Sequence, residues 1–129
     1  MTKQRQTAQA SAPLGRWWLT AVIIGLNLLV FGFGLLIGMD AFTPSSLDLL
    51  NLGANFAPLT ATGDTWRLFS SMFIHIGLMH LLINMWALYI LGSYAEFYFG
   101  RLFYVALYFL SGIMGSLATT WWNLPAAEA

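Results

Sequence analysis

The residues best suited to chemistry gather in one largely uncharged, apolar stretch between positions 66 and 101. In chain order they are Trp66, Arg67, His75, His80, Asn84, Gly92, Glu96, Gly100 and Arg101. His80 and Asn84 lie four residues apart, so on a helix both side chains project from the same face. No charged residue occurs between Arg67 and Glu96, which is typical of a membrane span. Imidazole and carboxamide groups are costly to bury in hydrocarbon, so this pair indicates a functional site.

The spacing of His80 and Asn84 leaves two interpretations open. One is polar packing, because Asn and His side chains bond across the interfaces of membrane helices. The other is a pair of hydrogen-bond donors that faces a water-accessible cavity and stabilises a developing oxyanion. A zinc site is poorly supported, because the two histidines of the chain, His75 and His80, would lie about 140° apart on one helix. No cysteine or nearby carboxylate joins them.

The other polar positions each fit a structural role. Trp66 and Arg67 would anchor the chain at the membrane interface, with the guanidinium reaching toward lipid headgroups. His75 would lie near the outer end of a span. Glu96 and Arg101 would form an ion pair at the inner boundary, which contributes little if it is exposed.

Composition places the chain in lipid. Hydrophobic residues make up 59% of its 129 residues and charged residues only 8%, against roughly 25% charged residues in soluble domains. A soluble domain of this size could not hide so much apolar surface. The zero net charge gives no basic field to attract nucleic acid. The absence of cysteine, of a phosphate-binding Gly-rich loop and of a ligand cluster predicts no metal, nucleotide or organic cofactor.

Three long apolar stretches predict an all-α polytopic membrane protein with transmembrane helices at about 17–39, 72–95 and 102–122. The first is too long for the apolar core of a signal peptide. Residues 1–16 are expected to form a disordered cytoplasmic tail, and residues 40–71 a long first loop. Within that loop, Ser45 and Asp48 resemble a capping box that opens a short helix. The short connection at 96–101 makes the second and third spans antiparallel neighbours.

Charge and aromatic residues suggest how the spans sit in the membrane. Lys3, Arg5 and Arg16 precede the first span, whereas the following loop carries one Arg and three Asp. The positive-inside rule therefore places the N-terminus in the cytoplasm. Two tryptophan pairs, at 17–18 and 121–122, occupy positions typical of an interfacial aromatic belt.

Taken together, the polar positions between Trp66 and Arg101 agree in order and spacing with a known family. They resemble the first half of a bacterial rhomboid intramembrane serine protease, over roughly residues 17–129 and most specifically over 66–101. The resemblance implies a six-helix core, in which a Gly-x-Ser-Gly serine on the fourth helix attacks a peptide bond in or near a substrate's transmembrane segment. A histidine on the sixth helix would be its base.

The resemblance also implies a role for each matching residue. His80 and Asn84 would be the oxyanion-stabilising side chains, and His75 and Gly100 would be structural. Trp66 and Arg67 would belong to a first loop lying partly in the membrane. Glu96 and Arg101 would brace the cytoplasmic end of the second and third helices.

The chain departs from the family pattern, because it has no Gly-x-Ser-Gly motif and no histidine after His80. We therefore expect a truncated rhomboid-like serine endopeptidase, inactive alone because it lacks the nucleophile and the base. A non-catalytic rhomboid-like protein that binds transmembrane segments is the alternative, and an unrelated three-span protein with polar packing is a third reading. The expected partners are membrane lipid, transmembrane-segment substrates and a complementing C-terminal half. The expected location is a bacterial inner membrane.

Overall fold

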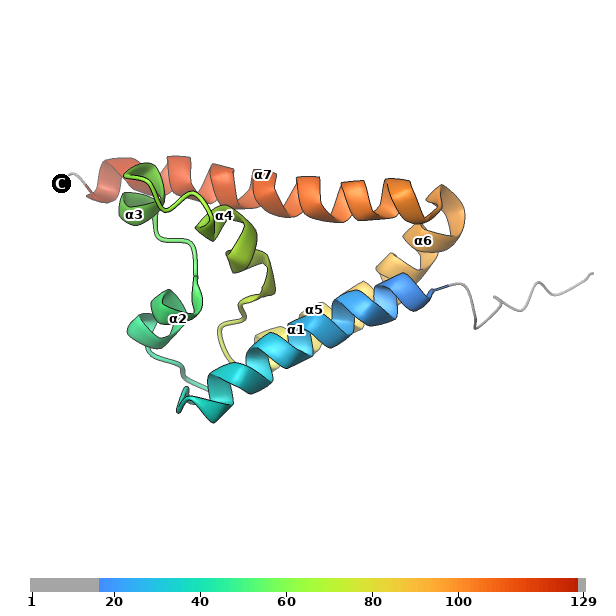
Figure 1. The fold of residues 1–129 in the computed structure, drawn as a ribbon, viewed down its shortest axis with the longest axis horizontal. Coiled ribbons are helices and arrows are strands. Elements are labelled where there is room, and N and C mark those ends of the chain that lie inside the picture. The colour runs from blue at the N-terminus through green and yellow to red at the C-terminus, as the bar shows by residue number, and fades with distance from the viewer. Residues whose placement is uncertain (1–16, 128–129) are drawn as a thin grey trace, which may run out of the picture.

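The protein, described here by a computed structural model over residues 17–127, is built from helices, and no strand occurs in this range (Figure 1). Three helices are long and apolar enough to cross a membrane, at Trp18–Leu36, Leu78–Phe99 and Arg101–Pro125. The predicted all-α polytopic membrane fold is therefore confirmed. The tail expected at residues 1–16 lies outside the described residues.

The first two spans run side by side (Figure 1). Helix α1 (Trp18–Leu36) packs against a second span made of α5 (Leu78–Ala87), a π-helical turn η2 (Leu88–Gly92) and α6 (Ser93–Phe99). Phe31 from α1, Leu81 from α5 and Met39 form a small buried cluster near the C-terminal end of α1 and the N-terminal end of α5. Apolar side chains on the opposite faces are exposed, as expected where hydrocarbon is the solvent.

The helix of the second span begins at Leu78, although the sequence suggested a start near Met72. Gly77 directly before it has a φ of +87°, a conformation that residues with a Cβ rarely adopt. A Cβ at this position would also lie 2.6 Å from the carbonyl oxygen of Phe42. The first amide of the helix, that of Leu78, donates to the carbonyl of Ala41 at 2.7 Å. The first loop thus fixes where α5 starts.

The third span, α7 (Arg101–Ala127), follows α6 after a turn at Gly100, whose φ is +78°. Near this turn the two helices are neighbours, as the short connection predicted. Farther along they diverge, and α4 (Arg67–Ser70) and η1 (Ser71–Phe73) from the first loop pack against α7 (Figure 1). The prediction that the second and third spans are antiparallel neighbours therefore holds only near the turn at Gly100. Farther from this turn, α4 and η1 of the first loop lie between the two spans.

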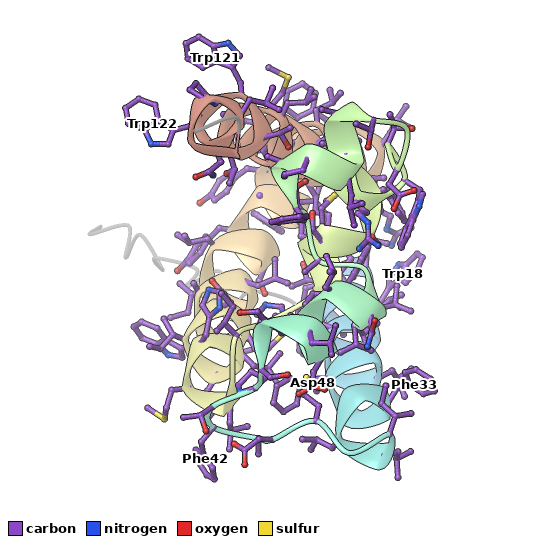
Figure 2. All side chains as sticks on the ribbon, turned by 90° about the vertical axis from the view of Figure 1, so that its left-hand side faces the viewer. Trp18, Phe33, Phe42, Asp48, Trp121 and Trp122 are labelled. Carbon is purple, nitrogen blue, oxygen red and sulfur yellow. The ribbon has the colours of Figure 1, made fainter. Side chains whose placement is uncertain are left out.

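The rest of the first loop forms two short helices, α2 (Ser46–Leu52) and α3 (Ala57–Ala61). The predicted capping box at the start of α2 is confirmed. Ser45 Oγ accepts from the amide of Asp48 at 3.1 Å, while the Asp48 carboxylate accepts from the amide of Ser45 at 3.2 Å. Helix α3 packs on the last turns of α7, and beyond it Trp121 and Trp122 project away from the body of the protein (Figure 2).

Candidate functional site

A partly open cavity of about 400 Å³ lies between α1, the α5–η2 segment and α7. Its wall is mainly apolar but carries six polar residues, which are Asn27, His75, Asn84, Tyr108, Ser111 and Ser116. Such groups are rare in membrane-spanning segments, and they mark functional pathways when they gather around a cavity. A mainly apolar cavity with a few convergent polar groups is the usual form of a binding site.

Asn84 lines this cavity from α5. Its side chain makes no hydrogen bond to other residues of the 17–127 range, and it is partly exposed. The carboxamide NH₂ group therefore remains available to donate to a group in the cavity. The donor role that the sequence suggested for Asn84 remains a prediction.

His80 lies one turn before Asn84 on α5 and is exposed rather than part of the cavity wall. Its Nδ1 accepts a hydrogen bond from the backbone amide of Ile76 at 3.3 Å. A ring nitrogen that accepts carries no proton, so neutral His80 has its proton on Nε2. The local fold thereby makes Nε2 of His80 a hydrogen-bond donor.

His75 is buried in the cavity wall, with its ring centroid 5.3 Å from that of His80. The sequence placed the two rings on different sides of one helix, and this is wrong because His75 precedes the start of α5. Burial lowers the pKa of His75 below its usual 6.5, with the nearby His80 adding to the effect and a hydrogen bond to the Phe73 carbonyl opposing it. Because that carbonyl at 3.3 Å only accepts, Nδ1 of His75 carries the proton and Nε2 is an acceptor.

The histidine pair alone does not make a metal site. Across residues 17–127, no group of three His, Cys, Asp or Glu side chains is placed to hold a metal ion. Zinc sites in proteins use at least three such ligands.

Glu96 is buried and binds α1 rather than Arg101. Its carboxylate accepts from the amides of Leu19 at 3.2 Å and Thr20 at 2.8 Å, and from the Thr20 hydroxyl at 2.8 Å. Helix α1 has no side-chain cap of its own, so a residue of α6 caps its N-terminus. The expected pair between Glu96 and Arg101 is therefore wrong, because the open amides of α1 are a closer partner for the carboxylate.

Arg101 instead places its guanidinium 5.1 Å from the centroid of the Trp18 ring. This contact is a cation–π interaction between the start of α7 and the start of α1. Glu96 thus attaches the second span to the first, and Arg101 attaches the third span to the first.

Gly92 and Tyr104 complete the contact around Glu96. The Tyr104 hydroxyl lies 3.2 Å from Thr20 Oγ1. A Cβ at Gly92 would lie 2.7 Å from the Tyr104 oxygen and 3.1 Å from Thr20 Cγ2. Only glycine leaves room here for α1, η2 and α7 to meet.

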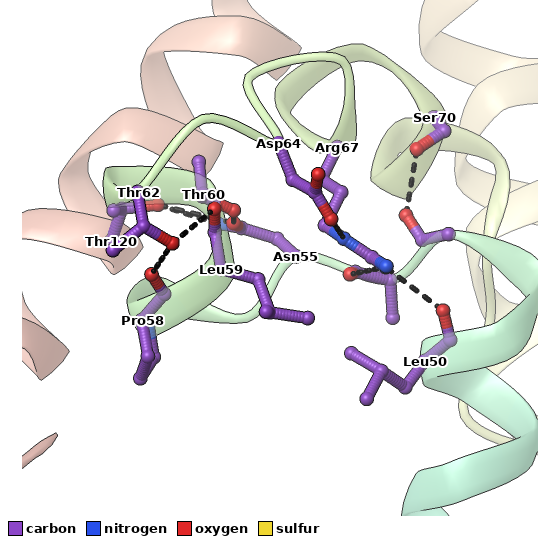
Figure 3. A network of polar contacts seen from close by, with 12 residues as sticks. Leu50, Asn55, Pro58, Leu59, Thr60, Thr62, Asp64, Arg67, Ser70 and Thr120 are labelled. Atoms are coloured by element: carbon purple, nitrogen blue, oxygen red, sulfur yellow. Dashed lines mark hydrogen bonds and ion pairs between the residues drawn. The ribbon is translucent and has the colours of Figure 1, made fainter.

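Arg67 is buried inside the first loop, where Figure 3 shows its contacts. It donates to the Asp64 carboxylate at 3.0 Å and to the carbonyls of Leu50 and Ala54 at 2.8 and 3.1 Å. The guanidinium also lies 4.5 Å from the ring centroid of Trp66, which is exposed. The expectation that Arg67 reaches toward headgroups is wrong, because its guanidinium donates to carbonyls at the end of α2 that have no partner within the helix.

A second polar network fixes α3 to α7 (Figure 3). Asn55 donates to the Ser116 carbonyl and to the Thr120 hydroxyl, both at 2.9 Å, and accepts from Thr60 at 2.8 Å. The Asn55 carboxamide thus both donates and accepts hydrogen bonds, whereas the Asn84 carboxamide does neither within residues 17–127.

Sequence reasoning missed Asn27 of α1 and Tyr108 of α7, which both line the cavity. Asn27 Nδ2 donates to the Tyr108 hydroxyl at 3.4 Å. A signal was present, because Asn27 and Thr20 are the only two residues of the first span with polar side chains other than the tryptophans.

The fold and the cavity together define a polytopic helical membrane protein with a polar site between its spans. The family model described as the Rhomboid domain matches residues 62–127, which include all of the polar positions from Trp66 to Arg101. This chain belongs to the rhomboid family. The predicted family is thereby confirmed, and the reading as an unrelated three-span protein is excluded.

Individual relatives include both proteases and an inactive protein. The chain is 32% identical to Rhomboid protease AarA of Providencia stuartii over 116 residues, which are 90% of the chain and 41% of that protein. It is 32% identical to Rhomboid protease GluP of Bacillus subtilis (strain 168) over 117 residues, 91% of the chain and 22% of that protein. It is 44% identical to Inactive RHOMBOID-like protein 8 of Arabidopsis thaliana over 75 residues, 57% of the chain and 21% of that protein. No solved structure matches the chain.

The chain thus spans about two fifths or less of the length of these relatives. The family-model match at residues 62–127 contains both histidines and every residue of the cavity wall except Asn27. Because the match covers only part of these proteins, the activity, substrates and partners of a whole rhomboid protein are stated for this chain only as proposals.

Proposed function

We propose that this chain supplies the oxyanion-stabilising half of a rhomboid-type intramembrane serine endopeptidase. The observation that carries the proposal is the unused donor pair on α5. Asn84 lines the cavity with a free carboxamide, and the Ile76 amide holds His80 in the tautomer whose Nε2 donates. Donors fixed in place before the reaction stabilise the negative charge that develops on a scissile carbonyl oxygen.

The nucleophile and the base would come from outside the 129 residues. The family pattern assigns them to a Gly-x-Ser-Gly serine and a later histidine, and this sequence contains neither. Ser111 and Ser116 lie in the cavity wall together with His75, but within residues 17–127 no serine forms a hydrogen bond with the ring of His75 or of His80. The 129-residue polypeptide alone is therefore expected to be inactive, and a complementing C-terminal half to be its partner.

The substrate class follows from the position of the cavity. Three membrane-spanning helices contribute residues to the cavity wall, which supports a peptide bond in or near a transmembrane segment as the substrate. We place residues 17–129 in a partial rhomboid membrane domain, with the N-terminus in the cytoplasm of a bacterial cell and the spans in the inner membrane. The excess of Lys and Arg before the first span supports this orientation.

The test is a complementation assay in proteoliposomes with a transmembrane peptide as substrate. The chain alone should give no cleavage, and cleavage should appear when a C-terminal rhomboid half carrying the serine and histidine is supplied. His80→Ala and Asn84→Ala should each lower the rate about 10²- to 10³-fold, as removal of one oxyanion donor does elsewhere. Leu82→Ala, on the lipid side of the same helix, is the matched control and should leave the rate unchanged.

Two results would contradict the proposal. Cleavage by the 129-residue chain alone would show that the nucleophile lies within it. A complemented enzyme with full activity in both the His80→Ala and Asn84→Ala forms would remove their assigned role.

A non-catalytic function is the second candidate, supported by the 44% identity to an inactive rhomboid-like protein. In that case the cavity between α5 and α7 would bind a transmembrane segment without cleaving it. Crosslinking of the substrate peptide to the chain, combined with no cleavage in any complemented form, would favour this alternative.

A further inference from the structure

The second membrane span contains a π-helical turn, η2, between the segment that carries Asn84 and the segment that carries Glu96. A π-helical turn closes each backbone hydrogen bond over five residues in place of four, so it holds one residue more than an α-helical turn. Such turns are rare in proteins and frequently lie at functional sites. Directly after the turn, the Ser93 hydroxyl donates to the Tyr89 carbonyl and gives it a partner besides the backbone amides.

Both ends of this span are fixed by other parts of the chain. At its start, the Leu78 amide donates to the Ala41 carbonyl of the first loop. Toward its other end, the Glu96 carboxylate accepts from the amide and the hydroxyl of Thr20 on α1. The angle about the helix axis between Asn84 and Glu96 is therefore a constraint that the backbone between them has to meet.

The π-helical turn sets this angle. Every fourth residue of the segment lies toward the cavity or α1, and these residues are Asn84, Leu88, Gly92 and Glu96. In an unbroken α-helix each interval of four residues overshoots a full turn by about 40°, so Asn84 and Glu96 would lie about 120° apart. The additional residue in the π-helical turn takes up about 100° of this difference, which leaves the two side chains about 20° apart.

We propose that the π-helical turn is a positioning element of the site, which keeps the donor pair His80 and Asn84 on the same face of the span as Glu96. Glu96 fixes this face against α1, and the turn passes the orientation on to Asn84. The inference deepens the proposed function, and it rests on that function for the role of the donors. A turn that served only to admit the close contact of Gly92 with Tyr104 would not require a particular angle at Asn84.

Changes in length separate these two roles. Deletion of Ile90 removes the additional residue, so an ordinary α-helical turn forms and the angle of about 20° is kept. Insertion of one Ala after Tyr89 adds about 100° and turns Asn84 away from the cavity. An ordinary transmembrane helix would be rotated by about 100° by either change, so both changes would be equally harmful. The two changes combined restore the number of residues, and this combination is the matched control.

The first readout is the position of residue 84, and it uses the natural absence of cysteine in the chain. Asn84→Cys and Ser111→Cys, both in the cavity wall, are combined in each length variant and reconstituted in lipid nanodiscs. A bifunctional methanethiosulfonate should crosslink them equally in the wild-type length, the deletion and the control, and several-fold less in the insertion.

Equal crosslinking in the insertion variant, or its loss in the deletion variant, overturns the proposal. If the insertion variant does not fold, the deletion variant alone decides, because the proposal requires it to fold and to crosslink.

The second readout is cleavage in the complementation assay, with Asn84 and Ser111 kept in place. The deletion variant should cleave at the rate of the wild-type chain, whereas the insertion should lower the rate about 10²-fold or more, because it displaces the donors. An insertion variant as active as the wild-type chain would contradict the positioning role. Crosslinking as expected, without cleavage by any complemented form, would support the positioning element and contradict the proposed function, so the two failures are distinguishable.

Discussion

Helix α1 makes two polar contacts that each include a tyrosine of α7, and they differ in how completely their groups are paired. At the first, Glu96 accepts three hydrogen bonds from Leu19 and Thr20, and the Tyr104 hydroxyl closes the group. At the second, one helical turn farther along α7, Asn27 donates to Tyr108 over a longer distance, and its Oδ1 beside the cavity has no partner within residues 17–127. Both contacts bury polar side chains within membrane spans. The fully paired contact is suited to holding helices together, and the incompletely paired one to binding something else.

The largest expected effect in this comparison comes from Glu96→Ala. The change removes an acceptor from two amides and a hydroxyl that stay buried, so we expect the free energy of unfolding to fall by about 3 kcal/mol or more. Unfolding in mixed micelles with increasing sodium dodecyl sulfate measures it. Glu96→Gln keeps one acceptor oxygen and should lose clearly less. If Glu96→Ala unfolds like the wild-type protein, the carboxylate does not hold α1.

Gly92→Ala tests how tightly the paired contact is packed. The added methyl group would meet the Tyr104 hydroxyl, and relieving this overlap should cost about 1–3 kcal/mol of stability. Gly115→Ala on α7 is the control, because a Cβ at this position would have nothing within 4 Å. Alanine there should be neutral or stabilise the helix by up to about 1 kcal/mol. Equal effects of the two changes would show that the spans do not meet closely at Gly92.

Removing one hydroxyl from each contact compares them directly. Tyr104→Phe should destabilise the protein by about 1 kcal/mol, the usual net contribution of one hydrogen bond. Tyr108→Phe should cost less, because its bond to Asn27 is longer, at 3.4 Å against 3.2 Å. The same unfolding assay ranks the two variants. A larger loss for Tyr108→Phe would reverse the comparison and assign the cavity a structural role.

The sequence predicted the elements better than their contacts. Apolar length and the absence of charge were enough to predict three spans, and Ser45 with Asp48 was enough to predict the start of α2. The partner of Glu96 was mistaken, because the nearest opposite charge in the sequence, Arg101, competes with amides at the N-terminus of α1 that are distant in the chain. The contact between His75 and His80 was missed for a similar reason. A contact between Gly77 and the first loop sets the start of α5, so His75 lies before the helix and not on it. Long-range packing decides these details, and local periodicity does not report it.

The smallest expected effect is a pH dependence that separates the two histidines of the cavity region. Burial lowers the pKa of His75 below 6.5, so the folded protein holds this side chain neutral while the unfolded chain takes up a proton more readily. The resulting contribution to stability is present above the usual pKa near 6.5 and is lost as the pH falls through the lowered value. Unfolding curves between pH 8 and pH 5 should therefore show a modest destabilisation in acid, which His75→Phe removes and His80→Phe, at an exposed position, does not. If the acid effect persists in His75→Phe, another group is responsible, and the burial of His75 in the cavity wall does not set the charge state of this site.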